Sequence, residues 1–89
     1  MFIKSLAQPL IGTVINVRDK KLVEQFGIHL KKLRLEANYT QEELANEADI
    51  PINQVGRIER GEVNPTLSTL NAISKALRIS LPELLKFNQ

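Results

Sequence analysis

The chain has 89 residues, no cysteine, 43% hydrophobic residues and a formal net charge of +2. This length and composition predict one folded domain with a modest core and exclude a disordered chain, disulfides and cysteine zinc sites. No apolar run approaches the roughly 18 residues of a membrane span, so no membrane association is expected, and the lack of cysteine suits a reducing cytoplasm.

The first 18 residues differ in character from the rest of the chain. Residues 10–17, LIGTVINV, are rich in β-branched side chains and follow a proline, which predicts a short strand or an extended arm. We therefore interpret residues 1–18 as an N-terminal arm and residues 19–89 as a single domain. The arm either packs on its own domain or pairs with a second subunit, and both alternatives stay open.

Helical spacing begins at Asp19 and predicts a first helix, then a second helix with a short turn after it. Thr40, with Glu43 three residues later, forms a capping box that starts the second helix. The sequence ADIP, residues 48–51, is the turn, in which Asp49 tolerates left-handed backbone angles. In the first helix, apolar residues recur at intervals of three and four, at Leu22, Phe26, Leu30, Leu33 and Ala37.

A third helix is predicted over residues 51–60, with Pro51 in its first turn and Gly61 as its C-terminal stop. On a helical wheel, Val55 and Ile58 face inward. The opposite side is either a solvated face or a surface with the size and chemistry to enter the DNA major groove. That side contains Asn53, Gly56, Arg57 and Arg60.

Two further helices complete the predicted domain. Thr66 caps the fourth helix, and Ser80 with Glu83 forms a capping box for a short fifth helix. The apolar stripe of the fourth helix is expected to comprise Leu67, Leu70, Ile73 and Leu77.

Four motifs occur in order along the chain: TQEELA (40–45), RIERG (57–61), NPTLSTL (64–70) and ISLPELL (79–85). Together they resemble the Xre family of helix-turn-helix domains, which is related to the lambdoid phage repressors and Cro proteins. The resemblance covers about residues 22–86. It implies an all-α, five-helix, lambda-repressor-like bundle that binds double-stranded operator DNA as a transcriptional regulator, repressor-like and often a homodimer.

The resemblance also assigns roles to individual residues. Gln41 matches a residue that binds a phosphate at the start of the second helix. Arg34 and Glu59 match an ion pair between the first and third helices. Positions that face base edges or adjoining phosphates are matched by Pro51, Ile52, Asn53, Gln54 and Arg57. Positions that contact the DNA backbone are matched by Arg60 and Asn64.

Three departures from the family pattern affect this assignment. Asp49 stands where the turn usually has glycine, and it adds a negative charge beside the predicted binding face. Ile52 stands at an often polar position, where it either contacts a thymine methyl group or packs on protein. Gly56 lies in the middle of a helix, where it either permits close approach to DNA or is simply tolerated.

The sequence contains no recognisable catalytic constellation, metal-ligand set or cofactor motif, so we expect no enzyme and no cofactor. His29, the single histidine, is expected at the surface. A homodimer would form through the N-terminal arm or through the fifth helix with Leu81, Leu85 and Phe87. Two other functions fit the same fold: a protein-interaction module, and an antitoxin that binds both a toxin and its own operator.

Overall fold

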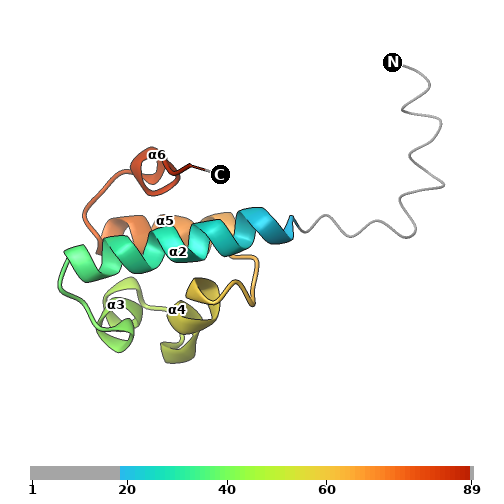
Figure 1. The fold of residues 1–89 in the computed structure, drawn as a ribbon. Helices are drawn as coiled ribbons and strands as arrows, with labels where there is room; N and C mark the ends of the chain where they lie inside the picture. The colour runs from blue at the N-terminus through green and yellow to red at the C-terminus, as the bar shows by residue number, and fades with distance from the viewer. Residues whose placement is uncertain (1–18, 89) are drawn as a thin grey trace, which may run out of the picture.

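The computed structural model describes residues 19–88, so the predicted N-terminal arm lies outside the described residues. Within this range the chain forms five helices and no strand, as predicted. In Figure 1, α3 and α4 lie on one side of the long helix α2, and α6 lies on the other. The helices are α2 (Lys20–Glu36), α3 (Gln41–Ala48), α4 (Ile52–Glu59), α5 (Leu67–Ala76) and α6 (Leu81–Leu84).

The predicted starts of α3, α5 and α6 are confirmed, and each depends on local hydrogen bonds. The Thr40 side chain accepts from the Glu43 amide, and the Glu43 carboxylate accepts from the Thr40 amide, which completes the capping box of α3. Ser80 and Glu83 form the same arrangement at α6, and Thr66 caps α5. Each cap satisfies amide groups that a helix start otherwise leaves without a partner.

The turn between α3 and α4 and the end of α4 both use left-handed backbone angles. Asp49 has φ 57° and Gly61 has φ 73°, as the sequence predicted for each. The prediction for Pro51 was wrong by one residue. Its backbone is extended, and it precedes the helix, which begins at Ile52.

The hydrophobic core lies where α2, α3, α4 and α5 meet and is closed by Leu84 of α6. The amphipathic spacing of each helix delivers its apolar side to this centre. Its members are Phe26, Leu30, Leu44, Ala45, Ala48, Val55, Ile58, Ile73, Ala76 and Leu84.

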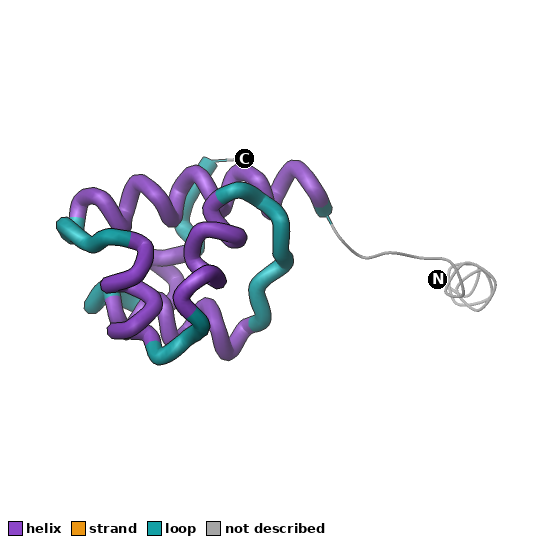
Figure 2. Tube along the Cα trace, turned by 90° about the horizontal axis from the view of Figure 1, so that it is seen from below, coloured by secondary structure: helices purple, strands orange, loops and turns teal. Residues whose placement is uncertain are grey.

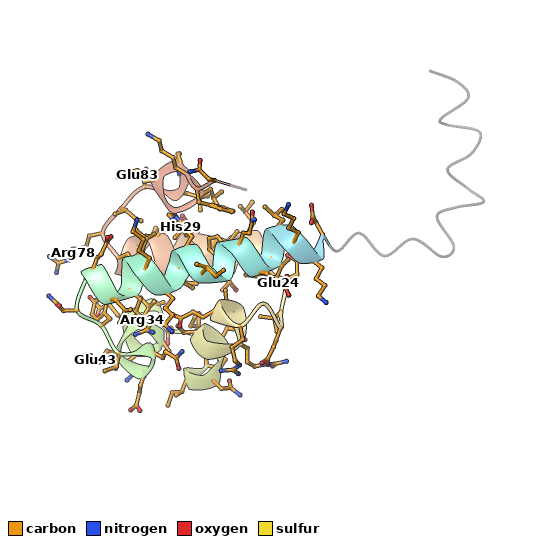
Figure 3. The ribbon with its side chains drawn as sticks, in the orientation of Figure 1. Glu24, His29, Arg34, Glu43, Arg78 and Glu83 are labelled. Atoms are coloured by element: carbon orange, nitrogen blue, oxygen red, sulfur yellow. The ribbon has the colours of Figure 1, made fainter. Side chains whose placement is uncertain are left out.

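Three residues depart from their predicted environment. Ala37 and Leu67 were assigned to apolar stripes, but Ala37 is exposed beyond the end of α2, and Leu67 is 69% exposed in the first turn of α5. His29 was expected at the surface. It is instead half-buried on the side of α2 that faces α6, where its ring stacks on Phe87 at a centroid distance of 5.2 Å (Figure 3).

Candidate nucleic-acid interface

Helices α3 and α4 form a compact pair around a three-residue turn (Figure 2, viewed from their side of the molecule). The Ile50 amide donates to the Ala45 carbonyl at 3.0 Å, which closes the end of α3 over the turn. Ala45, Val55 and Ile58 have no exposed surface. Because α3 and α4 share this dry contact, they form one rigid unit.

A buried ion pair links this helix pair to α2. Arg34 binds Glu59 through two hydrogen bonds, of 2.6 Å from Nε and 3.1 Å from Nη2, as the sequence resemblance led us to expect. The two side chains are only 8% and 3% exposed. Arg34 also donates from Nη1 to the Tyr39 carbonyl, at 2.9 Å, in the loop before α3 (Figure 3). One guanidinium therefore contacts both the end of α4 and the approach to α3.

Gln41 extends this network to the first turn of α3. Its Nε2 donates to Glu59 Oε1 at 2.9 Å. We define the cluster of Arg34, Gln41 and Glu59 as the buried brace, after its buried Arg34–Glu59 pair; Gln41 itself is exposed. It joins one residue from each of the three helices, and its directional hydrogen bonds define the position of α4 relative to α2 and α3.

Two glycines make this close packing possible. A Cβ on Gly27 would lie 2.5 Å from the backbone carbonyl oxygens of Ile58 and Glu59, so α4 approaches α2 too closely there for any side chain. A Cβ on Gly56 would lie 3.1 Å from Gln41 Oε1 and 3.0 Å from Arg60 Nη1. Gly56 is buried beneath the ends of these two side chains.

The outer side of α4 presents most of the residues that the sequence singled out. Ile52 is 57% exposed, which removes the alternative that it packs on the protein within the described domain. Gln54 is half-buried and is the least accessible of the set. The other predicted positions are exposed and lie at the start of α3, in the turn before α4, along α4 or in the loop after it: Gln41, Pro51, Asn53, Arg57, Arg60 and Asn64.

Two arginines of this surface share one carboxylate, that of Glu62. Arg60 Nε donates to Glu62 Oε2 at 2.5 Å, and Arg57 Nε lies 3.9 Å from Glu62 Oε1. The hydrogen bond from Arg60 lowers the pKa of Glu62, and the same bond raises the pKa of Arg60. We define Arg57, Arg60 and Glu62 as the exposed cluster.

Residues 19–88 hold neither a cluster of possible metal ligands nor a helix that could cross a membrane. Within that range, no three histidine, aspartate or glutamate side chains come together as metal ligands. None of the helices between those residues is both long and apolar enough to span a bilayer.

A family model described as helix-turn-helix matches residues 30–84, which include α3, α4 and α5 in full. The chain belongs to the helix-turn-helix family. The predicted five-helix bundle with a helix-turn-helix is therefore confirmed, and the chain is a DNA-binding transcriptional regulator.

Several relatives support this assignment. The chain is 40% identical over 63 residues to control protein C.BamHI of Bacillus amyloliquefaciens, covering 70% of this chain and 78% of that protein. It is also 40% identical over 55 residues to the immunity repressor protein of Bacillus phage phi105, and there it spans 38% of the repressor. The solved structure of the restriction-modification controller protein C.AhdI from Aeromonas hydrophila superposes with a TM-score of 0.68 and 36% identity, over 72% of this chain and 96% of that one.

Sequence reasoning about this helix-turn-helix chain missed two residues, Gly27 and Glu62. A glycine inside a strongly helical run is a signal of close packing, because it costs stability without another reason to be there. Glu62 gave no such signal. It lies in the loop after α4, and only the folded turn brings its carboxylate back beside Arg57 and Arg60.

Proposed function

We propose that the chain binds operator DNA as a homodimer, with the outer side of α4 in the major groove and repression as its regulatory effect. The observation that supports this most directly is the contrast between the two sides of α4. The inner side is held by the buried brace, and the outer side presents amide, guanidinium and methyl groups to solvent. A rigid helix with such groups matches the donor, acceptor and methyl pattern of base edges.

Three residues would read the bases. Arg57 is the principal candidate, because its guanidinium fits the two acceptors of a guanine edge. Asn53 is exposed one turn earlier and would bind adenine through its amide, and Gln54 would assist from its half-buried position. Ile52, exposed in the first turn of α4, would contact a thymine methyl group.

The DNA backbone would be held from both ends of the helix pair. Gln41 lies in the first turn of α3, where backbone amides favour a phosphate. Pro51, Arg60 and Asn64 would contact the adjoining phosphates or the sugar edge. Such contacts set the register of the protein on the duplex and carry no sequence information themselves.

We place the dimer contact at α6. Leu85 is 42% exposed, and beside it lies an apolar hollow of about 270 Å³ whose lining includes Leu70, Leu85 and Phe87. An exposed apolar surface of this kind is typical of a protein–protein contact. The exposed Leu67 lies one turn before Leu70 and would extend this apolar contact surface. The proposal needs no catalytic step or cofactor, and it places the protein with the DNA in the cytoplasm.

The first experiment is selection of bound duplexes from a random DNA pool, followed by sequencing. We expect an enriched motif with two-fold symmetry, whose half-site spacing reports the geometry of the dimer. Salt-sensitive binding without an enriched motif would contradict sequence-specific recognition, because it would leave phosphate attraction alone.

The second step is to measure Arg57→Ala on the selected site and on variants of it. If Arg57 reads a guanine, the substitution costs about 1–3 kcal/mol on the preferred site and relaxes the preference at one position. Arg78→Asn is the matched control. It removes one exposed arginine from the turn after α5, and asparagine tolerates the left-handed angles of that position. An equal loss on all sequences would assign Arg57 to phosphate.

A further inference from the structure

In the exposed cluster, the Glu62 carboxylate lies beside Arg57 and Arg60, the two arginines that the proposed function assigns to DNA binding. Glu62 Oε2 accepts from Arg60 Nε, and Glu62 Oε1 lies 3.9 Å from Arg57 Nε. The second nitrogen of Arg60, Nη2, also faces Glu62 Oε1 at 3.5 Å. The two guanidinium edges closest to the loop after α4 are therefore directed at one glutamate of the same chain.

The fold does not require this arrangement. The turn after α4 is already closed by backbone bonds, from Gly61 to the Ile58 carbonyl at 3.0 Å and from Glu62 to the Arg57 carbonyl at 2.9 Å. The three side chains are 46%, 57% and 47% exposed for Arg57, Arg60 and Glu62. Ion pairs between such exposed groups contribute little to stability, because water screens them.

We propose that the Glu62 carboxylate is an internal competitor for the DNA phosphate backbone, which occupies Arg60 and attracts Arg57 until a duplex displaces it. This inference rests on the proposed function and deepens it. A phosphate and a carboxylate both bind the guanidinium edge through two parallel hydrogen bonds, so they compete for the same donors of Arg60. Once displaced, Glu62 remains close to the bound phosphate, and like charges repel.

As a consequence, the protein would bind DNA of every sequence with lower affinity than it would without the Glu62 carboxylate. Phosphate attraction provides nearly all of non-specific binding, so a competitor of phosphate reduces the time spent on non-specific DNA. Base contacts by Asn53 and Arg57 would still distinguish the operator, because Glu62 hydrogen-bonds Arg60, the arginine assigned to the backbone, and only approaches Arg57, at 3.9 Å.

The test compares wild type with Glu62→Gln as full chains. Binding to the selected operator and to a duplex of random sequence is measured across a series of salt concentrations. We expect Glu62→Gln to bind both duplexes about three to ten times more tightly at low salt, by the same factor for each. We also expect the logarithm of its affinity to fall more steeply with the logarithm of salt concentration, by the amount that corresponds to about one additional phosphate contact.

Two further variants isolate the mechanism. Glu36→Gln removes an exposed carboxylate at the C-terminal end of α2 and changes the net charge equally, and we expect it to alter affinity much less. Glu62→Gln introduced into an Arg60→Ala chain should give little gain, because the donor under competition is gone. An equal gain from Glu36→Gln, or a full gain without Arg60, would overturn the competition.

The remaining outcomes decide between this inference and the proposed function. If wild type selects an operator motif but Glu62→Gln binds DNA no more tightly than wild type, the inference alone is overturned. Glu62 would then orient the arginines for DNA. A gain on only one of the two duplexes would also overturn it. Failure of wild type and every variant to enrich a motif would overturn the proposed function itself.

Discussion

The C-terminal end of α4 takes part in two arginine–glutamate clusters, the buried brace at Glu59 and the exposed cluster at Glu62, which lie in opposite environments. In the buried brace, Arg34 and Glu59 are 8% and 3% exposed and make two mutual hydrogen bonds, and Gln41 adds a third to the carboxylate. In the exposed cluster, Arg60 and Glu62 are 57% and 47% exposed. The carboxylates of Glu59 and Glu62 therefore face very different amounts of solvent although they lie within one turn of each other in the chain, and so do their arginine partners.

This difference in exposure gives the two clusters different roles: the buried one maintains the fold, and the exposed one is available to bind DNA. A buried charge must keep its partner, because losing the partner leaves an ion without water or hydrogen bonds. Such a pair fixes geometry but cannot exchange ligands. An exposed pair loses little when it opens, so its arginine can release the glutamate and bind an anion from outside. Helix α4 is thus held in place at Glu59 and left available for DNA at Arg57 and Arg60.

The largest expected effect comes from breaking the buried brace. Arg34→Met leaves the Glu59 carboxylate buried without its main partner, and we expect a loss of about 3–5 kcal/mol in the free energy of unfolding. Denaturant unfolding of wild type and variant measures it, with Arg78→Asn as an exposed-arginine control. DNA affinity should fall as well, because α4 loses its position. Unchanged melting would contradict the role of the brace.

A double variant sharpens this test. Arg34→Met combined with Glu59→Leu removes both charges, and replacing a buried ion pair with apolar groups restores much of the stability. If the brace positions α4, DNA affinity should recover less than stability does. Parallel recovery of both would show that the pair serves stability alone.

The next largest effect concerns the glycines on either side of the brace. Gly27→Ala places a methyl group against backbone carbonyls of α4, which cannot yield as a side chain can. We expect a loss of about 1–3 kcal/mol, as for other overpacked sites. Gly56→Ala is the matched comparison, since its new methyl group meets only the ends of Gln41 and Arg60. Because alanine favours helix by about 1 kcal/mol, that variant should lose little stability or none. Equal losses would contradict this distinction.

The features that the sequence predicted well are those determined within a few residues. The capping boxes at Thr40 and Ser80 need only a carboxylate three residues later, and Gly61 needs only its own lack of a side chain. The left-handed angle of Asp49 is equally local. These signals place the helices, and the apolar spacing of α2, α3 and α4 then predicts which sides meet.

The features that the sequence did not predict depend on how helices meet in space. The stripe assigned to α5 began at Leu67, but this side chain is 69% exposed at the start of the helix, and the stripe reaches the core only from Leu70 onward. Gly56 was assigned to the DNA-facing side of the helix, but the ends of the Gln41 and Arg60 side chains lie over it. His29 is half-buried where Phe87, from the end of the described chain, stacks on it. None of these contacts has a sequence spacing that identifies it.

The smallest expected effect is the acid dependence of stability from the exposed cluster. The hydrogen bond from Arg60 holds the pKa of Glu62 below its usual value of 4.5. A carboxylate with a lowered pKa adds stability above the unfolded-state value, and this contribution disappears as the pH falls through its pKa in the folded state. Wild type should therefore be slightly more stable than Glu62→Gln at neutral pH, and the difference should vanish in acid. Thermal melting of both proteins from pH 7 down to pH 3 measures this. Since water screens the pair, the difference should stay far below that of Arg34→Met at every pH. A Glu62→Gln variant that melted as poorly as Arg34→Met would mean that the exposed cluster, too, is part of the architecture, and that its glutamate is not free to give way to DNA.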